Sequence, residues 1–266
     1  MKLSVVIPFY NEENMIQKMY DELVKEINQI TKAEFEIIFI NDGSKDRTFE
    51  RMLAIAAADS RVKYISFSRN FGKEAGTIAG LEYATGEAVI LMDGDLQHPP
   101  ALIPQMIAAY EEGYDVVSAR RTRTGEKPHR TFLAKHFYKL ANKMMDIELM
   151  DGVSEFRLFS RKVVNAIISM QEYNRFSKGI FAWVGFNEKV IEYENQVRTV
   201  GETKYSLKFS LNYAIQGILS FNDKPLRMCI NFGLFCLLIS LVYVLWTFIQ
   251  YLVEPNSLVS GYFTTI

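Results

Sequence analysis

The stretch from Cys229 to Val253 contains no charged side chain, and it constrains the chain more than any other feature. As an α-helix this stretch would be about 37 Å long, which exceeds the roughly 30 Å hydrocarbon core of a bilayer. Tyr243, Trp246 and Tyr251 supply amphipathic rings, with Tyr251 suited to the far interface. A buried helix of a soluble protein would be unusually long and unbroken. We therefore predict a transmembrane helix over residues 228–253.

The residues on either side of this span predict how the chain is organised. Lys224 and Arg227 precede the span, which favours a cytoplasmic location for the N-terminal part and insertion in the inner or plasma membrane. Residues 254–266 read as a loop leading to a second span that this sequence does not complete. Both cysteines lie in the apolar stretch, so they cannot staple a soluble domain, and a reducing compartment is expected. The apolar run at the N-terminus is too short for a signal peptide and reads as a strand.

Before the span, apolar β-branched runs alternate with helical periodicity. Strands are expected at Leu3–Ile7, Phe35–Ile40, Val62–Phe67 and Ala88–Met92. One helix is indicated by the apolar face formed by Met15, Met19, Leu23 and Ile27. This alternation predicts an α/β fold with a mostly parallel sheet and helices on both faces, over residues 1–205. The formal net charge of −1 gives no indication of nucleic-acid binding.

Each expected strand ends in polar or charged residues. The four segments that follow begin at Pro8, Asn41, Ser68 and Asp93. Ligands of open α/β sheets bind beyond the carboxyl ends of the strands, so these segments are expected to share a site. Asp93 and Asp95 follow a buried strand directly, and two such carboxylates repel each other unless a cation lies between them. Oxygen ligands suit Mg²⁺ or Mn²⁺, and the intervening glycine would let the backbone approach a phosphate-bearing substrate closely.

These segments also carry a family resemblance. They read Val-Val-Ile-Pro-Phe-Tyr-Asn-Glu-Glu from Val5, Ile-Asn-Asp-Gly-Ser-Lys-Asp from Ile40, Ser-Arg-Asn-Phe-Gly-Lys-Glu-Ala from Ser68 and Met-Asp-Gly-Asp-Leu-Gln-His-Pro-Pro from Met92. The pattern resembles the inverting family 2 glycosyltransferases with the GT-A fold. It is most similar to dolichyl-phosphate mannose synthases and bactoprenol glucosyltransferases. The resemblance continues through Glu155–Leu158 and Val197–Ser206 to Ser220–Arg227.

The resemblance implies roles for individual residues. The expected nucleotide-sugar contacts are Pro8, Tyr10, Glu12, Asp42, Ser44 and Asp93, with Asp42 near the base. The expected metal ligands are Asp93, Asp95 and Gln97, for Mg²⁺ or Mn²⁺. Basic residues matching positions near the acceptor phosphate are Arg120 or Arg121, Arg130 and Arg198. The expected catalytic set is Glu155, Asp95, Arg198 and Lys204, the last two neutralising phosphate charge.

Glu155 departs from the family pattern, which has aspartate as the candidate base at this position. Glutamate carries the same charge on a longer arm, and a small misplacement alters catalysis. A lipid phosphate has a second pKa of about 6, so at neutral pH it is largely a dianion and needs little deprotonation. Glu155 therefore either acts as the base or orients a sugar hydroxyl or Arg157.

Two amphipathic segments point to a lipid acceptor. Residues 206–227 place Leu207, Leu211 and Ile215 on one face directly before the span, which predicts an interfacial helix and linker. Residues 127–143 are basic, with no acidic side chain. Core-facing helices and an ordinary solvated surface are the alternatives, and for the basic segment an anionic partner such as lipid head groups is equally favoured.

We therefore expect transfer of glucose or N-acetylglucosamine from a UDP-sugar to undecaprenyl or another polyprenyl phosphate, for cell-envelope glycosylation. A family 2 transferase with a glycolipid or polysaccharide acceptor is an alternative, although the Gln-x-x-Arg-Trp motif of processive synthases is missing from the sequence. A catalytically weak, nucleotide-binding membrane scaffold is a second alternative, because of Glu155. The sequence leaves homo-oligomerisation open.

Overall fold

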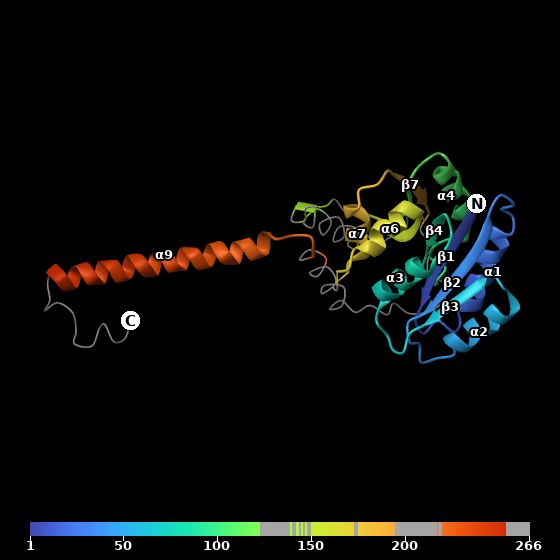
Figure 1. Ribbon diagram of the computed structural model, residues 1–266, viewed down its shortest axis with the longest axis horizontal. Helices are drawn as coiled ribbons and strands as arrows, with labels where there is room; N and C mark the ends of the chain where they lie inside the picture. Colours follow the sequence, from blue (N-terminus) through green and yellow to red (C-terminus); the bar gives the residue numbers. More distant parts are fainter. Residues whose placement is uncertain are drawn as a thin grey trace. The chain divides into compact units, whose positions relative to one another are not determined.

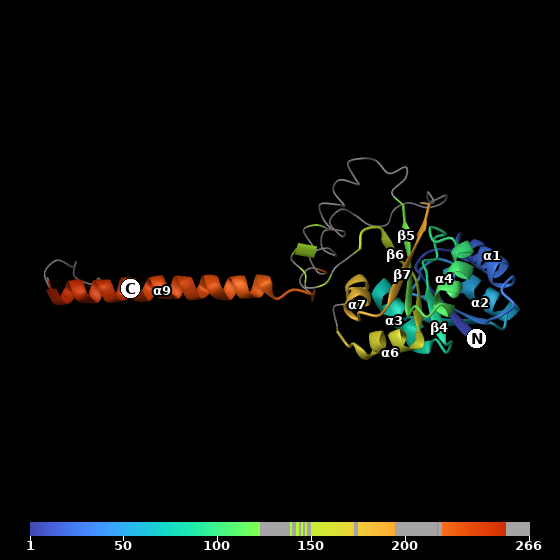
Figure 2. The ribbon, with the colours of Figure 1, turned by 90° about the horizontal axis from the view of Figure 1, so that it is seen from above.

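The computed structural model describes residues 1–122, 139, 142–143, 145, 147, 150–172, 175–194, 217 and 220–253. The chain divides into two compact units, Met1–Phe221 and Asn222–Ile266. The first unit contains a sheet with helices on both faces, and the second contains one long helix (Figures 1 and 2).

The sheet of the first unit has the strand order β3-β2-β1-β4-β6-β5-β7. Its strands are β1 (Lys2–Phe9), β2 (Glu34–Asn41), β3 (Val62–Ser66), β4 (Ala88–Leu91), β5 (Val116–Arg121), β6 (Val153–Ser160) and β7 (Glu188–Tyr193). β3, β2, β1 and β4 run parallel to one another, and β5 runs parallel to β7. β6 runs antiparallel to both of its neighbours, β4 and β5. The expected mostly parallel sheet is confirmed, with one reversed strand inside it.

Helices pack on both faces of the sheet and enclose two hydrophobic cores. One core includes side chains from α1 (Ile16–Ile27), α2 (Thr48–Ala58) and α4 (Ile103–Glu111). The other includes side chains from α3 (Lys73–Tyr83), α6 (Arg161–Ser169) and α7 (Ser177–Trp183). A short 3₁₀ helix, η1 (Pro100–Leu102), precedes α4.

Apolar strands such as β1 supply side chains to both cores. In β1, Val5 and Ile7 belong to the first core while Val6 belongs to the second, because successive side chains point to opposite faces. The apolar face expected for the first helix is confirmed, since Met19 and Leu23 are fully buried. The four expected strands also form, each within two residues of its expected ends.

The antiparallel strand β6 determines which residues meet at the sheet edge. Leu91 of β4 pairs with Arg157 of β6, so the start of β6 lies beside the end of β4. Glu155 therefore lies at the edge where the parallel strands end. Periodicity could not show this, because the strand order and direction depend on contacts between distant parts of the chain.

A buried carboxylate, Glu36, links the strands near the end of the sheet where the parallel strands begin. The Glu36 side chain is 4% exposed, and its two oxygens accept hydrogen bonds from Ser4 Oγ (2.5 Å), Thr85 N (2.6 Å) and Lys63 Nζ (2.8 Å). Burial by itself raises the pKa of Glu36, but the hydrogen bonds from Lys63, Ser4 and Thr85 outweigh burial and hold the pKa well below its usual range. Glu36 thus joins β1, β2, β3 and the segment before β4.

The second unit contains α9 (Lys224–Val253). Among the described residues, α9 is the one helix long and apolar enough to cross a membrane. Its large apolar side chains are exposed, as at Leu238 and Leu245. The expected interfacial helix over residues 206–227 and the loop over 254–266 fall largely or wholly outside the described residues, so these domain boundaries stay predictions.

The Glu36 network predicts a pH dependence of stability. Because the folded-state pKa is depressed, the network contributes fully above the unfolded pKa of about 4.3, and its contribution is lost as the pH falls below that value. Replacing Glu36 with Gln should cost about 3 kcal/mol of unfolding free energy at pH 7 and flatten the decline of stability between about pH 5 and pH 3. Thermal unfolding across this range checks both effects.

The matched control is Glu34→Gln, an exposed carboxylate on the same strand. This control should keep the wild-type stability and the wild-type pH slope. Equal pH slopes for Glu36→Gln and the wild type would contradict the prediction.

Candidate active site

The loops that follow β1 and β2 are tied to each other by hydrogen bonds. Asn11 N donates to Ser44 Oγ (3.0 Å), and Lys45 N donates back to Asn11 Oδ1 (2.8 Å). Glu12 N donates to Thr48 Oγ1 (2.8 Å). Asn11 takes a φ of 52°, a left-handed conformation that asparagine tolerates. The predicted nucleotide-contact residues Glu12 and Ser44 are therefore held by a fixed loop pair.

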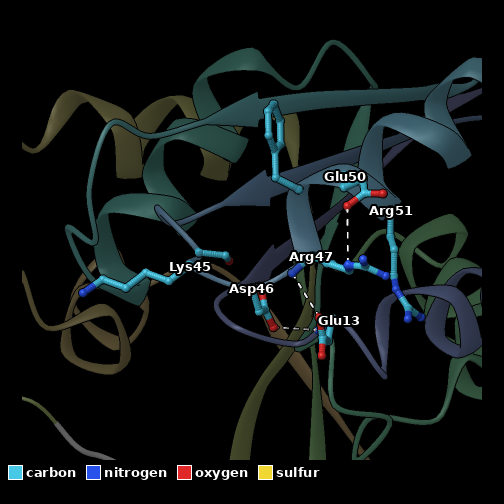
Figure 3. Close-up of a pocket in the computed structure, with 8 residues that line it drawn as sticks. Glu13, Lys45, Asp46, Arg47, Glu50 and Arg51 are labelled. Carbon is cyan, nitrogen blue, oxygen red and sulfur yellow. Dashed lines mark hydrogen bonds and ion pairs between the residues drawn. The ribbon is translucent and has the colours of Figure 1, made fainter.

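The same loops border an open groove, shown in Figure 3. Glu13 N donates to Asp46 Oδ2 (3.2 Å), and Arg47 N donates to Glu13 Oε2 (3.0 Å). The lining residues are Glu13, Ser44, Lys45, Asp46, Arg47, Phe49, Glu50 and Arg51. Of the residues predicted from the sequence to form the site, this lining includes Ser44 alone. The groove therefore differs from the cluster that the strand ends assemble.

Asp42 organises the loop between β3 and α3. Its carboxylate accepts hydrogen bonds from Phe71 N (2.7 Å), Gly72 N (3.0 Å) and Asn70 Nδ2 (2.8 Å). Burial raises the pKa of Asp42, although these backbone donors act in the opposite direction. Gly72 has a φ of 95°, which favours glycine. Asp42 thus sets the position from which α3 begins.

Asp93 and Asp95 lie in a turn directly after β4, as the sequence predicted. Gln97 N donates to Asp95 Oδ1 (3.1 Å), and Leu96 takes a φ of 59°. A Cβ added at Gly94 would lie 2.3 Å from Phe9 Cε1. The close approach of a buried phenylalanine ring therefore explains this glycine, whereas the sequence pattern suggested the approach of a phosphate-bearing substrate.

Lys73, the first residue of α3, bridges two carboxylates. Its ammonium contacts Asp93 Oδ1 directly and lies 2.6 Å from Glu155 Oε2. Burial lowers the pKa of Lys73, but the charges of Asp93 and Glu155 outweigh burial and raise it well above its usual range. For Asp93 burial acts the other way and raises the pKa, but the opposite charge of Lys73 outweighs burial and brings the pKa below its usual range. The three side chains form an ion cluster of net charge −1.

His98 supports the turn from the inside of the protein. Its Nδ1 accepts a hydrogen bond from Asp93 N (3.0 Å), and its ring stacks on Phe156 at 5.4 Å between centroids. Burial lowers the pKa of His98, more strongly than the neighbouring Asp93 raises it. A ring nitrogen that accepts a hydrogen bond belongs to the neutral imidazole. His98 therefore positions the backbone of Asp93 as a neutral side chain.

Arg157 does not pair with Glu155. Arg157 is 6% exposed, its Nη1 lies 3.3 Å from Glu188 Oε1, and its guanidinium lies 5.2 Å from the Phe181 ring centre. Burial lowers the pKa of Arg157, and the charge of Glu188 acts in the opposite direction. The Glu155 side chain contacts Lys73, and its charge also raises the pKa of Arg157, less strongly than the charge of Glu188 does, so an orienting effect of Glu155 on Arg157 stays a prediction.

The other predicted residues are distributed as follows. Pro8 and Tyr10 lie at the end of β1, and Arg120 and Arg121 lie at the end of β5, on the same edge of the sheet. Arg120 Nε donates to Glu192 of the adjacent strand β7 at 3.1 Å. Arg130, Arg198 and Lys204 fall outside the described residues, so their roles stay predictions.

Three residues near the carboxylates were not identified as site residues from the sequence. These are Lys73, His98 and Lys178, the last of which lowers the pKa of Asp93 by its charge, less strongly than Lys73 does. Lys73 and His98 belong to the polar segments that follow the third and fourth expected strands, and this location is a sequence signal for both residues. Lys178 lies in α7, for which no sequence signal pointed to the site.

The donor set fits a hard divalent cation. Asp93, Asp95 and Gln97 offer two carboxylates and one amide oxygen from a single turn. In the part of the chain that the structure describes, no group of three or more His, Cys, Asp or Glu side chains could hold a metal ion. Mg²⁺ is commonly held by one or two carboxylates, with substrate phosphates and water completing its shell. The turn therefore suits a metal that arrives with a phosphate ligand.

This chain is similar to known glycosyltransferases. A family model described as glycosyl transferase family 2 matches residues 4–168. CsbB of Bacillus subtilis (strain 168), which carries a provisional glycosyltransferase name, is 49% identical over 99% of this chain and 80% of its own length. The bactoprenol glucosyl transferase of Shigella phage SfV is 43% identical over 98% of this chain and 85% of its own length.

Two solved structures share the fold. Glucosyl-3-phosphoglycerate synthase of Mycobacterium tuberculosis, in complex with Mn²⁺, UDP and phosphoglyceric acid, gives a TM-score of 0.55 at 20% identity and covers 82% of this chain and 76% of its own. The mannosyltransferase PcManGT of Pyrobaculum calidifontis, in complex with GDP-Man and Mn²⁺, gives a TM-score of 0.53 at 18% identity. The match covers 71% of this chain and 54% of the mannosyltransferase chain. Together with the sheet order and the strand-end residues, the family model and the relatives show that this chain is a glycosyltransferase with a GT-A-like fold and belongs to glycosyl transferase family 2.

Proposed function

We propose that this chain transfers glucose from UDP-glucose to a polyprenyl phosphate, with inversion at the anomeric carbon and with Mg²⁺ or Mn²⁺ as cofactor. The observation that carries the proposal is the convergence of Asp93, Asp95 and Glu155 at the carboxyl edge of the sheet. The acceptor class rests on relatives named as bactoprenol glucosyl transferases. The exposed apolar helix α9 supports an anchor in the membrane, next to a lipid acceptor.

The donor would lie over the ends of β1, β2 and β4. Asp93, Asp95 and Gln97 would hold the metal, which when bound would neutralise charge on the leaving diphosphate. The tied loops of Glu12 and Ser44 would present fixed polar groups to the nucleotide. A fixed pocket reduces the ordering cost of binding, so the hydrogen bonds between these loops favour tight donor binding.

The acceptor phosphate would approach the face of the sugar opposite the diphosphate. As a dianion it is already a competent nucleophile, so positioning and charge neutralisation matter more than proton removal. Arg120 and Arg121 lie at the correct sheet edge for this task, and Arg130, Arg198 and Lys204 are proposed to add further positive charge. Glu155, which contacts Lys73, would lie between the donor and acceptor sides of the site.

The direct test uses the full chain in membranes with labelled UDP-glucose, undecaprenyl phosphate and Mn²⁺. We expect a lipid-linked glucose that disappears with EDTA and falls at least about a hundredfold in Asp95→Asn. Asp21→Asn, an exposed carboxylate on α1, serves as the matched control and should keep wild-type activity.

Other outcomes separate the alternatives. Product from UDP-N-acetylglucosamine alone would replace the proposed donor sugar. Transfer to a glycolipid or polysaccharide would replace the proposed acceptor. Nucleotide binding without transfer from any donor would reject the enzyme and favour a scaffold.

A second test asks whether Glu155 is the base. General bases typically contribute about 10²–10⁴ in rate. Because the acceptor is largely a dianion, Glu155→Gln should lower kcat less than about tenfold at pH 8, where the second phosphate pKa of about 6 is well exceeded. Initial rates at saturating donor measure the effect. A loss of a thousandfold or more at pH 8 would identify Glu155 as an essential base.

A further inference from the structure

The Lys73 ammonium contacts Asp93, the same carboxylate that is proposed to bind the divalent metal. We propose that Lys73 is the counter-ion shared by Asp93 and Glu155 before the donor arrives, where it offsets one of their two negative charges and opposes divalent metal at Asp93. The inference rests on the proposed function, because it takes Asp93 as a metal ligand. It adds a role for a residue that is neither a metal ligand nor the candidate base.

The backbone around Lys73 is built to deliver the ammonium to this point. Asp42 accepts hydrogen bonds from Phe71 N and Gly72 N, so the residue before Lys73 is fixed. Lys73 then begins α3, and the next residue, Glu74, accepts a hydrogen bond from Ser177 N of α7 (3.1 Å). The backbone on both sides of Lys73 is thus fixed, and the ordering cost that remains is that of the Lys73 side chain itself.

The charges around the ammonium explain why a cation is needed there. Asp93 comes from the end of β4 and Glu155 from the start of β6, and Lys73 contacts both. The exposed fractions of the three side chains are 33% for Lys73, 28% for Asp93 and 11% for Glu155. Water therefore screens the two carboxylates only in part, and without Lys73 they would repel each other.

The same arrangement opposes metal binding. A divalent ion at Asp93 would approach an ammonium already in contact with Oδ1 of that carboxylate. The like charges repel, so binding requires Lys73 to withdraw from Asp93. Glu155, 2.6 Å from Nζ, offers Lys73 a remaining partner after this withdrawal. In this way the arrival of the metal would leave Lys73 paired with Glu155 alone.

The test measures Mn²⁺ binding to the purified full chain, by the electron paramagnetic resonance signal of free Mn²⁺, in parallel with thermal unfolding. Lys73→Met should bind Mn²⁺ about tenfold more tightly than wild type, because the competing charge is gone. In EDTA the same variant should unfold about 5 °C lower, and saturating Mn²⁺ should restore most of this loss.

The matched control is Lys162→Met, which removes an ammonium 2.7 Å from Asp115, away from the site. It should leave Mn²⁺ affinity unchanged. Lys73→Arg keeps the charge and should bind Mn²⁺ as weakly as wild type. Should Lys73→Met fail to fold, the double variant Lys73→Met/Glu155→Gln removes the repelling carboxylate and should bind Mn²⁺ more tightly than Glu155→Gln alone, because the two differ only in the Lys73 charge.

Two outcomes would overturn the inference, and they are distinguishable. Equal or weaker Mn²⁺ binding by Lys73→Met, with clear binding by wild type, would refute the competition while leaving the proposed function intact. Mn²⁺ binding by neither protein, with or without UDP, would refute the metal site of the proposed function and the inference with it.

Discussion

The contact of one ammonium with two carboxylates is the interaction on which the site depends. Lys73, Asp93 and Glu155 come from the start of α3, the end of β4 and the start of β6, so their meeting requires the central part of the sheet to be assembled. Such a cluster is stable only when each charge has a partner, because unpaired charges with little access to water are costly. Under the proposed function, this cluster would receive the metal together with the donor diphosphate.

Hydrogen bonds elsewhere in the first unit join the strands and loops that form this edge. Glu36 joins three strands and the segment before β4 at the opposite edge, far along the strands from the site. Reciprocal hydrogen bonds fix the loops after β1 and β2, and Asp42 fixes the loop before α3. The stabilising Glu36 network and the candidate site thus lie toward opposite ends of the same strands. The stability from Glu36 offsets the cost of holding the two carboxylates Asp93 and Glu155 close together.

The sequence predicted the part of this account that depends on local pattern. The four N-terminal strands, the buried face of α1 and the gathering of polar strand ends follow from periodicity and from the rule for parallel sheets. The neighbours of Glu155 could not be predicted in this way, because the contact between Glu155 and Lys73 depends on the reversed direction of β6. Gly94 shows the same limit, since the ring of Phe9 that requires it lies on another strand.

In the proposed function, the turn after β4 receives the metal and the diphosphate of the donor. A crystal structure with Mn²⁺ and UDP-glucose, using anomalous scattering at the manganese edge, tests this claim most directly. We expect one manganese peak bound by carboxylate oxygens of Asp93 or Asp95 and by diphosphate oxygens, with Nζ of Lys73 withdrawn from Asp93. A nucleotide bound in the groove between Glu13 and Arg51, or a manganese peak away from both aspartates, would contradict it.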